Sequence, residues 1–248
     1  MPYQLYALIA VFAVSSISFA GVLFLSLQAE RLNRLLIYLV SFAAGAFFGD
    51  VFFHLLPELV EENGFSIALS LQILAGIVFF LVIEKVVQWR HCHSVDCDRH
   101  SLPLTTMNLI GDGVHNFIDG IVIGVSFIIS IPVGIATTIA VIVHEIPQEI
   151  GDCGVLLYGG LSKKKTLLFN FLSATLAIAG TIIALFIGVY AQTLTTYLGA
   201  FGVGTFLYIA GSDLIPEIKR DESLFHSLIQ SLIFMLGIGM MALLLVVE

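Results

Sequence analysis

Runs of apolar residues separated by short polar stretches fill almost the whole chain of 248 residues. Each run has about 20 residues, the length at which an α-helix crosses the hydrocarbon core of a bilayer. Almost no sequence is left for a soluble domain. The pattern predicts an all-α integral membrane protein with a single domain over residues 1–248. It predicts eight transmembrane helices, near residues 5–28, 35–57, 65–88, 104–130, 133–159, 166–190, 194–216 and 225–247.

The composition leads to the same class of protein. Hydrophobic residues make up 58% of the chain and charged residues 11%, with a mean hydropathy of +1.04. A soluble domain of this size could not bury so much apolar surface, so the chain must use lipid as solvent. The first apolar run lacks a basic leading segment and an evident cleavage site, and we expect it to be a retained helix.

All ten Lys and Arg residues fall in the connections that follow odd-numbered predicted helices. Loops rich in Lys and Arg stay on the cytoplasmic side, which predicts that both termini lie outside. Many of the acidic residues lie inside the predicted membrane segments. The net charge of −8 therefore indicates no basic partner, and we expect no nucleic-acid partner.

The predicted cytoplasmic loop over residues 90–100 is rich in His and Cys. Thiols in the cytoplasm stay reduced, so its two Cys residues do not suggest a disulfide. Their spacing matches no closed zinc-finger pattern, which leaves two interpretations: an accessory segment that collects metal ions, or a polar loop that happens to contain many His residues. The candidate ligands are His91, Cys92, His93, Cys97 and His100.

The fourth and fifth predicted helices carry a dense set of polar residues. Ionisable groups at membrane depth are costly and usually functional, and helical residues three or four apart share one face. No Lys or Arg lies within either helix, so a cation is the missing counter-charge. Imidazole together with carboxylate favours zinc, iron(II), manganese or cobalt over calcium, magnesium or an alkali ion. The candidate metal ligands are His115, Asn116, Asp119, His144, Glu145, Gln148 and Glu149.

Two pairs of motifs suggest an internal repeat. The sequence HLLPE at 54–58 resembles DLIPE at 213–217, and the His115 motif resembles the His144 motif. Members of each pair lie on helices that are predicted to run in opposite directions. Inverted repeats of this kind are typical of secondary transporters, and we expect one here.

Further acidic residues suggest a path for the ion. Asp50, His54 and Glu58 recur every four residues toward the outer end of the second helix. Inward of the centre we expect Asp112 and Asp152, followed by Asp213 and Glu217 near the exit. The alternative for Asp50, Asp213 and Glu217 is hydrogen bonding at helix ends.

The motifs HNFIDG, HEIPQEIGD, GDVFFHLLPE and YIAGSDLIPE together resemble the ZIP family of metal-ion transporters. The resemblance covers nearly the whole chain. It implies uptake of zinc or a related divalent metal toward the cytosol, by an elevator-like alternating-access movement. It also implies a binuclear centre between the fourth and fifth helices.

Specific roles follow from the resemblance. His115, Asp119 and Gln148 match ligands of the first metal site, while Asn116 and Glu145 match the second site, with Gln148 between the two. His144 and Glu149 also fall on motif positions. Gln148 departs from the related eukaryotic motif, which usually has His there, and a neutral amide is a weaker zinc ligand than imidazole.

We therefore expect a carrier and not an enzyme, with no catalytic cofactor and with Zn²⁺, Fe²⁺, Mn²⁺ or Cd²⁺ as the transported substrate. The chain resembles bacterial or archaeal members, which predicts the inner (plasma) membrane of a prokaryotic cell. Helix faces rich in small residues are compatible with a homodimer. The alternatives are a metal exporter, a metal sensor and an intramembrane zinc protease. The protease motif HExxH would need His at Gln148.

Overall fold

The computed structural model describes residues 3–19, 29–91, 101–188, 191–219 and 224–245. These ranges are helical apart from short turns, and no strand occurs within them. The α-helices are α1 (Tyr3–Ser15), α2 (Ala29–Asp50), α3 (Leu56–Asn63), α4 (Ile67–His91), α5 (Ser101–Ile129), α6 (Ile131–Tyr158), α7 (Lys163–Ala174), α8 (Leu176–Ile187), α9 (Ala191–Tyr208), α10 (Ile215–Ile218) and α11 (Leu224–Leu244). Two π-helical segments are η2 (Val51–Leu55) and η4 (Ile209–Leu214).

The predicted all-α membrane fold is confirmed. Within the described residues, seven helical stretches are long and apolar enough to cross a membrane, and a shorter apolar helix covers Tyr3–Phe19. The predicted number of eight spans and their orientation stay predictions. The seven stretches are Leu35–Glu61, Ile67–Val86, Leu104–Ile129, Ile131–Tyr158, Lys163–Ile187, Leu194–Ile218 and Leu224–Leu244.

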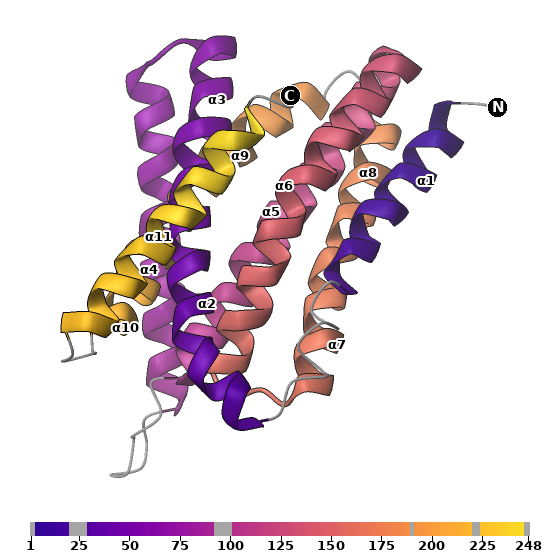
Figure 1. Ribbon diagram of the computed structural model, residues 1–248. Coiled ribbons are helices and arrows are strands. Elements are labelled where there is room, and N and C mark those ends of the chain that lie inside the picture. The colour runs from indigo at the N-terminus through magenta and orange to yellow at the C-terminus, as the bar shows by residue number, and fades with distance from the viewer. Residues whose placement is uncertain (1–2, 20–28, 92–100, 189–190, 220–223, 246–248) are drawn as a thin grey trace.

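The long helices run side by side, so the molecule has two distinct ends (Figure 1). The start of α1, the end of α11, and the connections after α3 and α5 lie at one end, uppermost in Figure 1. The last turns of α4, the start of α7 and the turn after α10 lie at the other end. Lys85, Lys163 and Lys219 belong to these last three segments. The ends of the molecule therefore differ in charge, as the orientation prediction requires.

The helices form two groups that meet at the centre. In one group α5 packs closely on α8, and α1, α6 and α7 surround this pair. In the other, α2 packs on α11 and α4 packs on α9. The groups meet mainly where α2 lies against α6 and α9 against α5. As a result, α5 and α6 are packed on both sides in the middle of the molecule.

Glycine allows the closest of these helix crossings. A Cβ atom on Gly120 would come within 1.9 Å of the Ala177 carbonyl oxygen, and one on Gly180 within 2.1 Å of the Phe117 carbonyl oxygen. The backbones of α5 and α8 could not approach this closely with any larger residue. This contact fixes the position of α5 against its neighbour.

The two π-helical segments lead into the paired motifs HLLPE and DLIPE and end on the second residue of each. Each passes into a short α-helix that has Pro in its first turn, Pro57 in α3 and Pro216 in α10. Proline has no N–H to donate, so the preceding turn loses a hydrogen bond and widens. The same local deformation in both motifs supports the predicted inverted repeat, which stays a prediction.

The sharp turn between α5 and α6 brings the two polar helices side by side. Only Ser130 separates them, and its side-chain oxygen accepts a hydrogen bond of 3.3 Å from the backbone N–H of Val133. This cap starts α6 in the antiparallel direction. Farther along α6, Pro147 lies inside the helix and leaves the carbonyl one turn earlier without its usual donor.

Candidate metal centre

Four side chains from α5 and α6 converge midway along the two helices. Their ligand atoms all lie within 4.8 Å of one another. The Nε2 atom of His115 is 3.4 Å from an Asp119 oxygen and 3.3 Å from a Glu145 oxygen. The Nε2 atom of His144 is 3.2 Å from the same Asp119 oxygen. Two imidazoles and two carboxylates therefore face one small volume.

Helix geometry and burial account for this convergence. His115 and Asp119 are one turn apart on α5, whereas His144 and Glu145 are adjacent on α6. His115, Asp119 and Glu145 are buried, and His144 is partly buried. The ring of Phe206 on α9 covers His115, with ring centroids 4.8 Å apart. The cluster thus has little contact with solvent.

The charges of this cluster do not balance when its imidazoles are neutral, as they are in metal ligands. Among the described residues, no Lys or Arg forms an ion pair with any of the four side chains. With neutral imidazoles, the two carboxylates leave two negative charges in a buried site, which is costly unless a cation compensates them. Two imidazole nitrogens with carboxylate oxygens make up a donor set that suits zinc and its neighbours.

The other three predicted ligands lie beside this cluster and make different contacts. The Asn116 amide nitrogen donates to an Asp112 oxygen at 2.7 Å. The Glu149 carboxylate accepts a hydrogen bond from Asn170 on α7. Gln148 is buried, and neither of its amide atoms has a hydrogen-bond partner. The structure thus brings four of the seven predicted ligands together and leaves Gln148 free to turn toward an ion.

A cavity of about 540 Å³ leads to the cluster from the end of the molecule that holds α3. Asp119 and His144 line its inner part, while Glu58 and Glu61 line its outer part. This cavity is therefore bordered by all three residues predicted for the outer path, which are Asp50, His54 and Glu58.

Asp50 and His54 differ in their surroundings. Asp50 is buried, and one of its carboxylate oxygens has no hydrogen-bond partner. His54 lies 3.0 Å from the backbone oxygen of Met241, and its ring centroid is 6.3 Å from that of His144. The alternative interpretation of Asp50 is hydrogen bonding at a helix end. It does not explain this oxygen, because the oxygen has no hydrogen-bond partner.

On the far side of the cluster, the predicted inner residues form two sets. Asp112 and Asp152 are buried between α5 and α6, and Asp152 accepts a hydrogen bond of 3.0 Å from Asn108. Asp213 lies on η4 and Glu217 on α10, where Tyr158 of α6 donates to Glu217 at 2.7 Å.

Several polar partners were not singled out from the sequence. They are Asn108, Asn170, Tyr158, and the pair in which Tyr208 donates to Glu84. A search for every polar side chain at membrane depth would have found Asn108, Asn170 and Glu84. The two tyrosines carry no such signal, because tyrosine is also common at membrane interfaces.

The predicted loop site lies outside the described residues, except for one position. His91 is the last residue of α4. Cys92, His93, Cys97 and His100 fall in the range that the structure does not describe. The loop site stays a prediction.

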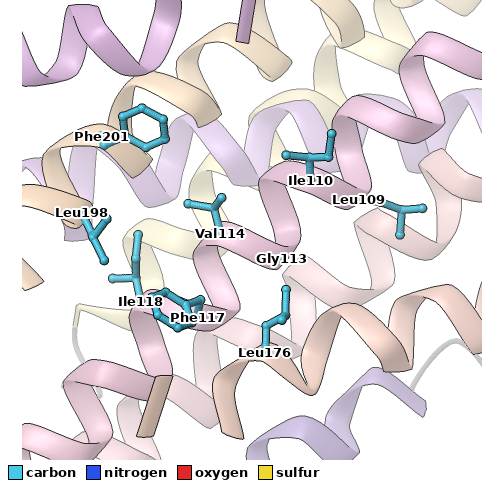
Figure 2. Close-up of a pocket in the computed structure, with 9 residues that line it drawn as sticks. All are labelled: Leu109, Ile110, Gly113, Val114, Phe117, Ile118, Leu176, Leu198 and Phe201. Atoms are coloured by element: carbon cyan, nitrogen blue, oxygen red, sulfur yellow. The ribbon is translucent and has the colours of Figure 1, made fainter. Parts of the chain in front are cut away.

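A different cavity, of about 460 Å³, lies between α5, α8 and α9 (Figure 2). Its lining side chains are apolar and include Phe117, Leu176 and Phe201. None of its nine lining residues has a side-chain nitrogen, oxygen or sulfur. This cavity therefore offers no side-chain ligand to a metal ion, in contrast to the one that reaches His144.

Comparison with known proteins decides the family. A family model described as ZIP zinc transporter matches residues 1–102 and 90–245, which is most of the chain. The chain belongs to this family. The predicted membership is thereby confirmed, and a family of transporters places the chain outside the enzymes.

The curated relatives of this ZIP protein are named as zinc transporters. Zinc transporter ZIP10 of Danio rerio is 39% identical over 149 residues, covering 57% of this chain and 18% of the relative. Zinc transporter zipt-7.2 of Caenorhabditis elegans is 30% identical over 304 residues, covering 98% of this chain and 66% of the relative. Zinc transporter ZIP6 of Homo sapiens is 36% identical, covering 64% of this chain and 23% of the relative.

The chain spans less than two thirds of the length of each of these relatives. All three come from animals. The predicted likeness to bacterial or archaeal members therefore stays a prediction.

Proposed function

We propose that this protein carries zinc and related divalent transition-metal ions across a membrane toward the cytoplasm. The observation that carries the proposal is the buried cluster of His115, Asp119, His144 and Glu145. With neutral imidazoles its negative charges lack a cation, and its donors suit zinc. The names of the relatives, which are zinc transporters, favour the same substrate.

Zinc is the expected principal substrate, and iron(II), manganese and cadmium are the expected secondary ones. Mixed imidazole and carboxylate donors bind such ions without strict discrimination. A carrier also has to release its ion, which excludes a site that binds too tightly. Gln148 and Asn116, beside the cluster, would supply amide oxygens to a second metal ion, giving the binuclear centre that the family resemblance implies.

The ion would enter from outside, past Glu58, His54 and Asp50, and leave past Asp213 and Glu217. In support, a cavity joins the first three residues to Asp119 and His144. On the opposite side, the hydrogen bond from Tyr158 to Glu217 ties α6 to α10. An alternating-access movement of the α5–α6 group against the α2–α11 group would break this bond. The basic residues at that end of the molecule favour a cytoplasmic exit.

The rival functions have less support. An intramembrane zinc protease needs two His residues four positions apart, and Gln148 stands where the second would be. A metal sensor would bind the same ion, and a measured flux separates it from a carrier. An exporter would use the same ligands, and only the direction of flux separates it from an importer.

Three further proposals concern the setting of the protein. The loop over residues 90–100 would collect metal ions at the cytoplasmic exit. The membrane would be the plasma membrane of a prokaryotic cell. A homodimer would use an apolar outer helix face.

The experiment is metal uptake by proteoliposomes that contain the purified protein. Zinc, cadmium, iron(II) and manganese are supplied outside, and the initial rates are measured with an indicator dye inside. We expect saturable uptake that is fastest for zinc. Uptake no faster than in protein-free vesicles would overturn the proposal.

A further inference from the structure

The apolar cavity between α5, α8 and α9 lies where the two groups of helices meet. Side chains of α5, among them Val114 and Phe117, form its floor, while Leu176 of α8 and Phe201 of α9 lie on either side of it (Figure 2). Both α8 and α9 pack against α5, but they make few contacts with each other. The space left between α8 and α9 is what forms the cavity.

The apolar cavity reaches the outer surface of the helix bundle. Leu176, which lines it, is 42% exposed, and Val114, Phe117 and Phe201 are only partly buried. Water gains no side-chain hydrogen bond by entering, and cavities lined by apolar side chains stay dry. Only apolar material is therefore suited to occupy this cavity.

The apolar cavity lies at the depth of the membrane interior. Its α5 residues run from Leu109 to Ile118, within the stretch Leu104–Ile129 that is long and apolar enough to span a membrane. His115, in the middle of this run, faces Glu145 on α6 instead and does not line the cavity. At this depth a bilayer offers hydrocarbon chains and no headgroups. The material that surrounds the opening is therefore the acyl chains of lipids.

The size of the apolar cavity suits an acyl chain. Its volume of about 460 Å³ lies within the range of about 300–1,000 Å³ that is typical of sites for small ligands. An empty void forfeits the dispersion contacts of its lining, which a flexible hydrocarbon chain restores. A helix of a second copy of this protein is about 10 Å wide, so the cavity has room for only about one of its turns. A single acyl chain is therefore the better fit.

We propose that the apolar cavity binds one acyl chain of a bilayer lipid, seated between α8 and α9 with α5 as its floor. This chain contacts both groups of helices at the place where they meet, on the side of α5 that faces away from the metal centre. A movement of one group against the other changes the space between α8 and α9, so the bound chain has to shift or leave. This influence on transport rests on the proposed function, whereas the binding does not.

The test is photochemical labelling of the protein by lipid. The purified protein is reconstituted into phosphatidylcholine vesicles in which a small fraction of the lipid carries a diazirine in the middle of one acyl chain. After irradiation, mass spectrometry of the peptides locates the adducts. We expect adducts on Val114 and Phe117 in the cavity as well as on Phe186, which is 92% exposed on α8 and reports contact with bulk lipid.

A substitution that fills the apolar cavity should displace the bound chain. Leu198→Phe adds a ring from the α9 side, and most of the labelling of Phe117 should be lost while that of Phe186 stays. Val114→Phe fills the cavity from α5 and should act in the same way, which keeps the test decisive if one variant fails to fold. The matched control is Leu228→Phe, the same change at an exposed position of α11 that does not line the cavity. Circular dichroism checks that each variant is helical.

Adducts on Phe186 with none on Val114 or Phe117 would overturn the proposal, and would mean that the cavity is dry or covered by a second copy of the protein. So would labelling of Phe117 that neither filling variant reduces. For transport, Leu198→Phe should slow zinc uptake relative to Leu228→Phe while both variants bind zinc equally at the centre, and equal uptake would overturn the influence on transport. If the wild type failed to transport zinc, the proposed function would fail, but the labelling result would stand.

Discussion

Gln148 is the residue at which this chain departs from the related eukaryotic motif. It is buried beside the four side chains of the candidate metal centre, yet neither of its amide atoms makes a hydrogen bond. A buried amide without partners is costly, and an ion ligated by its oxygen would remove part of that cost. Gln148 is therefore well placed to influence which metal the centre prefers.

Replacing Gln148 by His should tighten zinc binding about tenfold, equivalent to about 1.4 kcal/mol. The added imidazole is a better zinc ligand than an amide oxygen. Because manganese favours oxygen ligands, its affinity should rise less. Competition titrations with a zinc chelator measure both values. Gln148→Leu, of similar size but without a ligand atom, is the control, and a similar gain in that variant would contradict the role given to position 148.

Sequence spacing predicted four side chains that the structure brings together, and their role as metal ligands stays a prediction. Helical periodicity put His115 and Asp119 on one face of α5, and two polar faces with no cation implied a shared ion. Spacing along the sequence could not show that Glu149 accepts a hydrogen bond from Asn170, because that contact depends on how α7 packs against α6. Nor could it show that Asn116 bonds Asp112, since each residue also fits a ligand role.

At the scale of helices, close backbone crossings hold α5 in place. The crossing of α5 and α8 depends on Gly120 and Gly180, where a Cβ atom would overlap a carbonyl oxygen of the other helix. The sequence does not show which helix packs against the glycines of α5. The widening to π-helix before Pro57 and Pro216 was not predicted.

Gly180→Ala should destabilise the protein by about 1–3 kcal/mol, because the backbone carbonyl of Phe117 cannot easily move away. Gly239→Ala is the matched control, since its Cβ would meet nothing within 4 Å on the exposed face of α11. That control should be neutral or slightly stabilising. Thermal unfolding in detergent measures both variants. Equal melting temperatures would show that the α5–α8 crossing contributes little to stability.

At the scale of the whole molecule, the two ends differ in charge and in access to the metal centre. The outer cavity opens at the end with Glu58 and Glu61, while Lys163, Lys164 and Lys165 begin α7 at the other end. The pattern of basic residues predicted this polarity from the sequence alone. The cavity itself could not be predicted, because it depends on side chains from several helices that are distant in the sequence.

The orientation can be tested with one cysteine at each end, in a chain carrying Cys92→Ser and Cys97→Ser. Ser66 and Ser162 are exposed residues at the starts of α4 and α7, at opposite ends of the molecule. In intact cells, a membrane-impermeant thiol reagent should label Ser66→Cys. It should label Ser162→Cys only after permeabilisation. The reverse pattern would place the basic end outside and would contradict the predicted orientation.

The most direct test of the central claim is zinc uptake by proteoliposomes containing wild type, His115→Ala or Glu145→Ala, with His226→Ala as the control. His226 lies exposed near the start of α11, away from the cluster of four ligands. With equal amounts of helical protein, the two variants of the centre should lose most of the saturable uptake, whereas His226→Ala should keep it. Unchanged uptake in His115→Ala and Glu145→Ala would contradict a carrier that uses this centre.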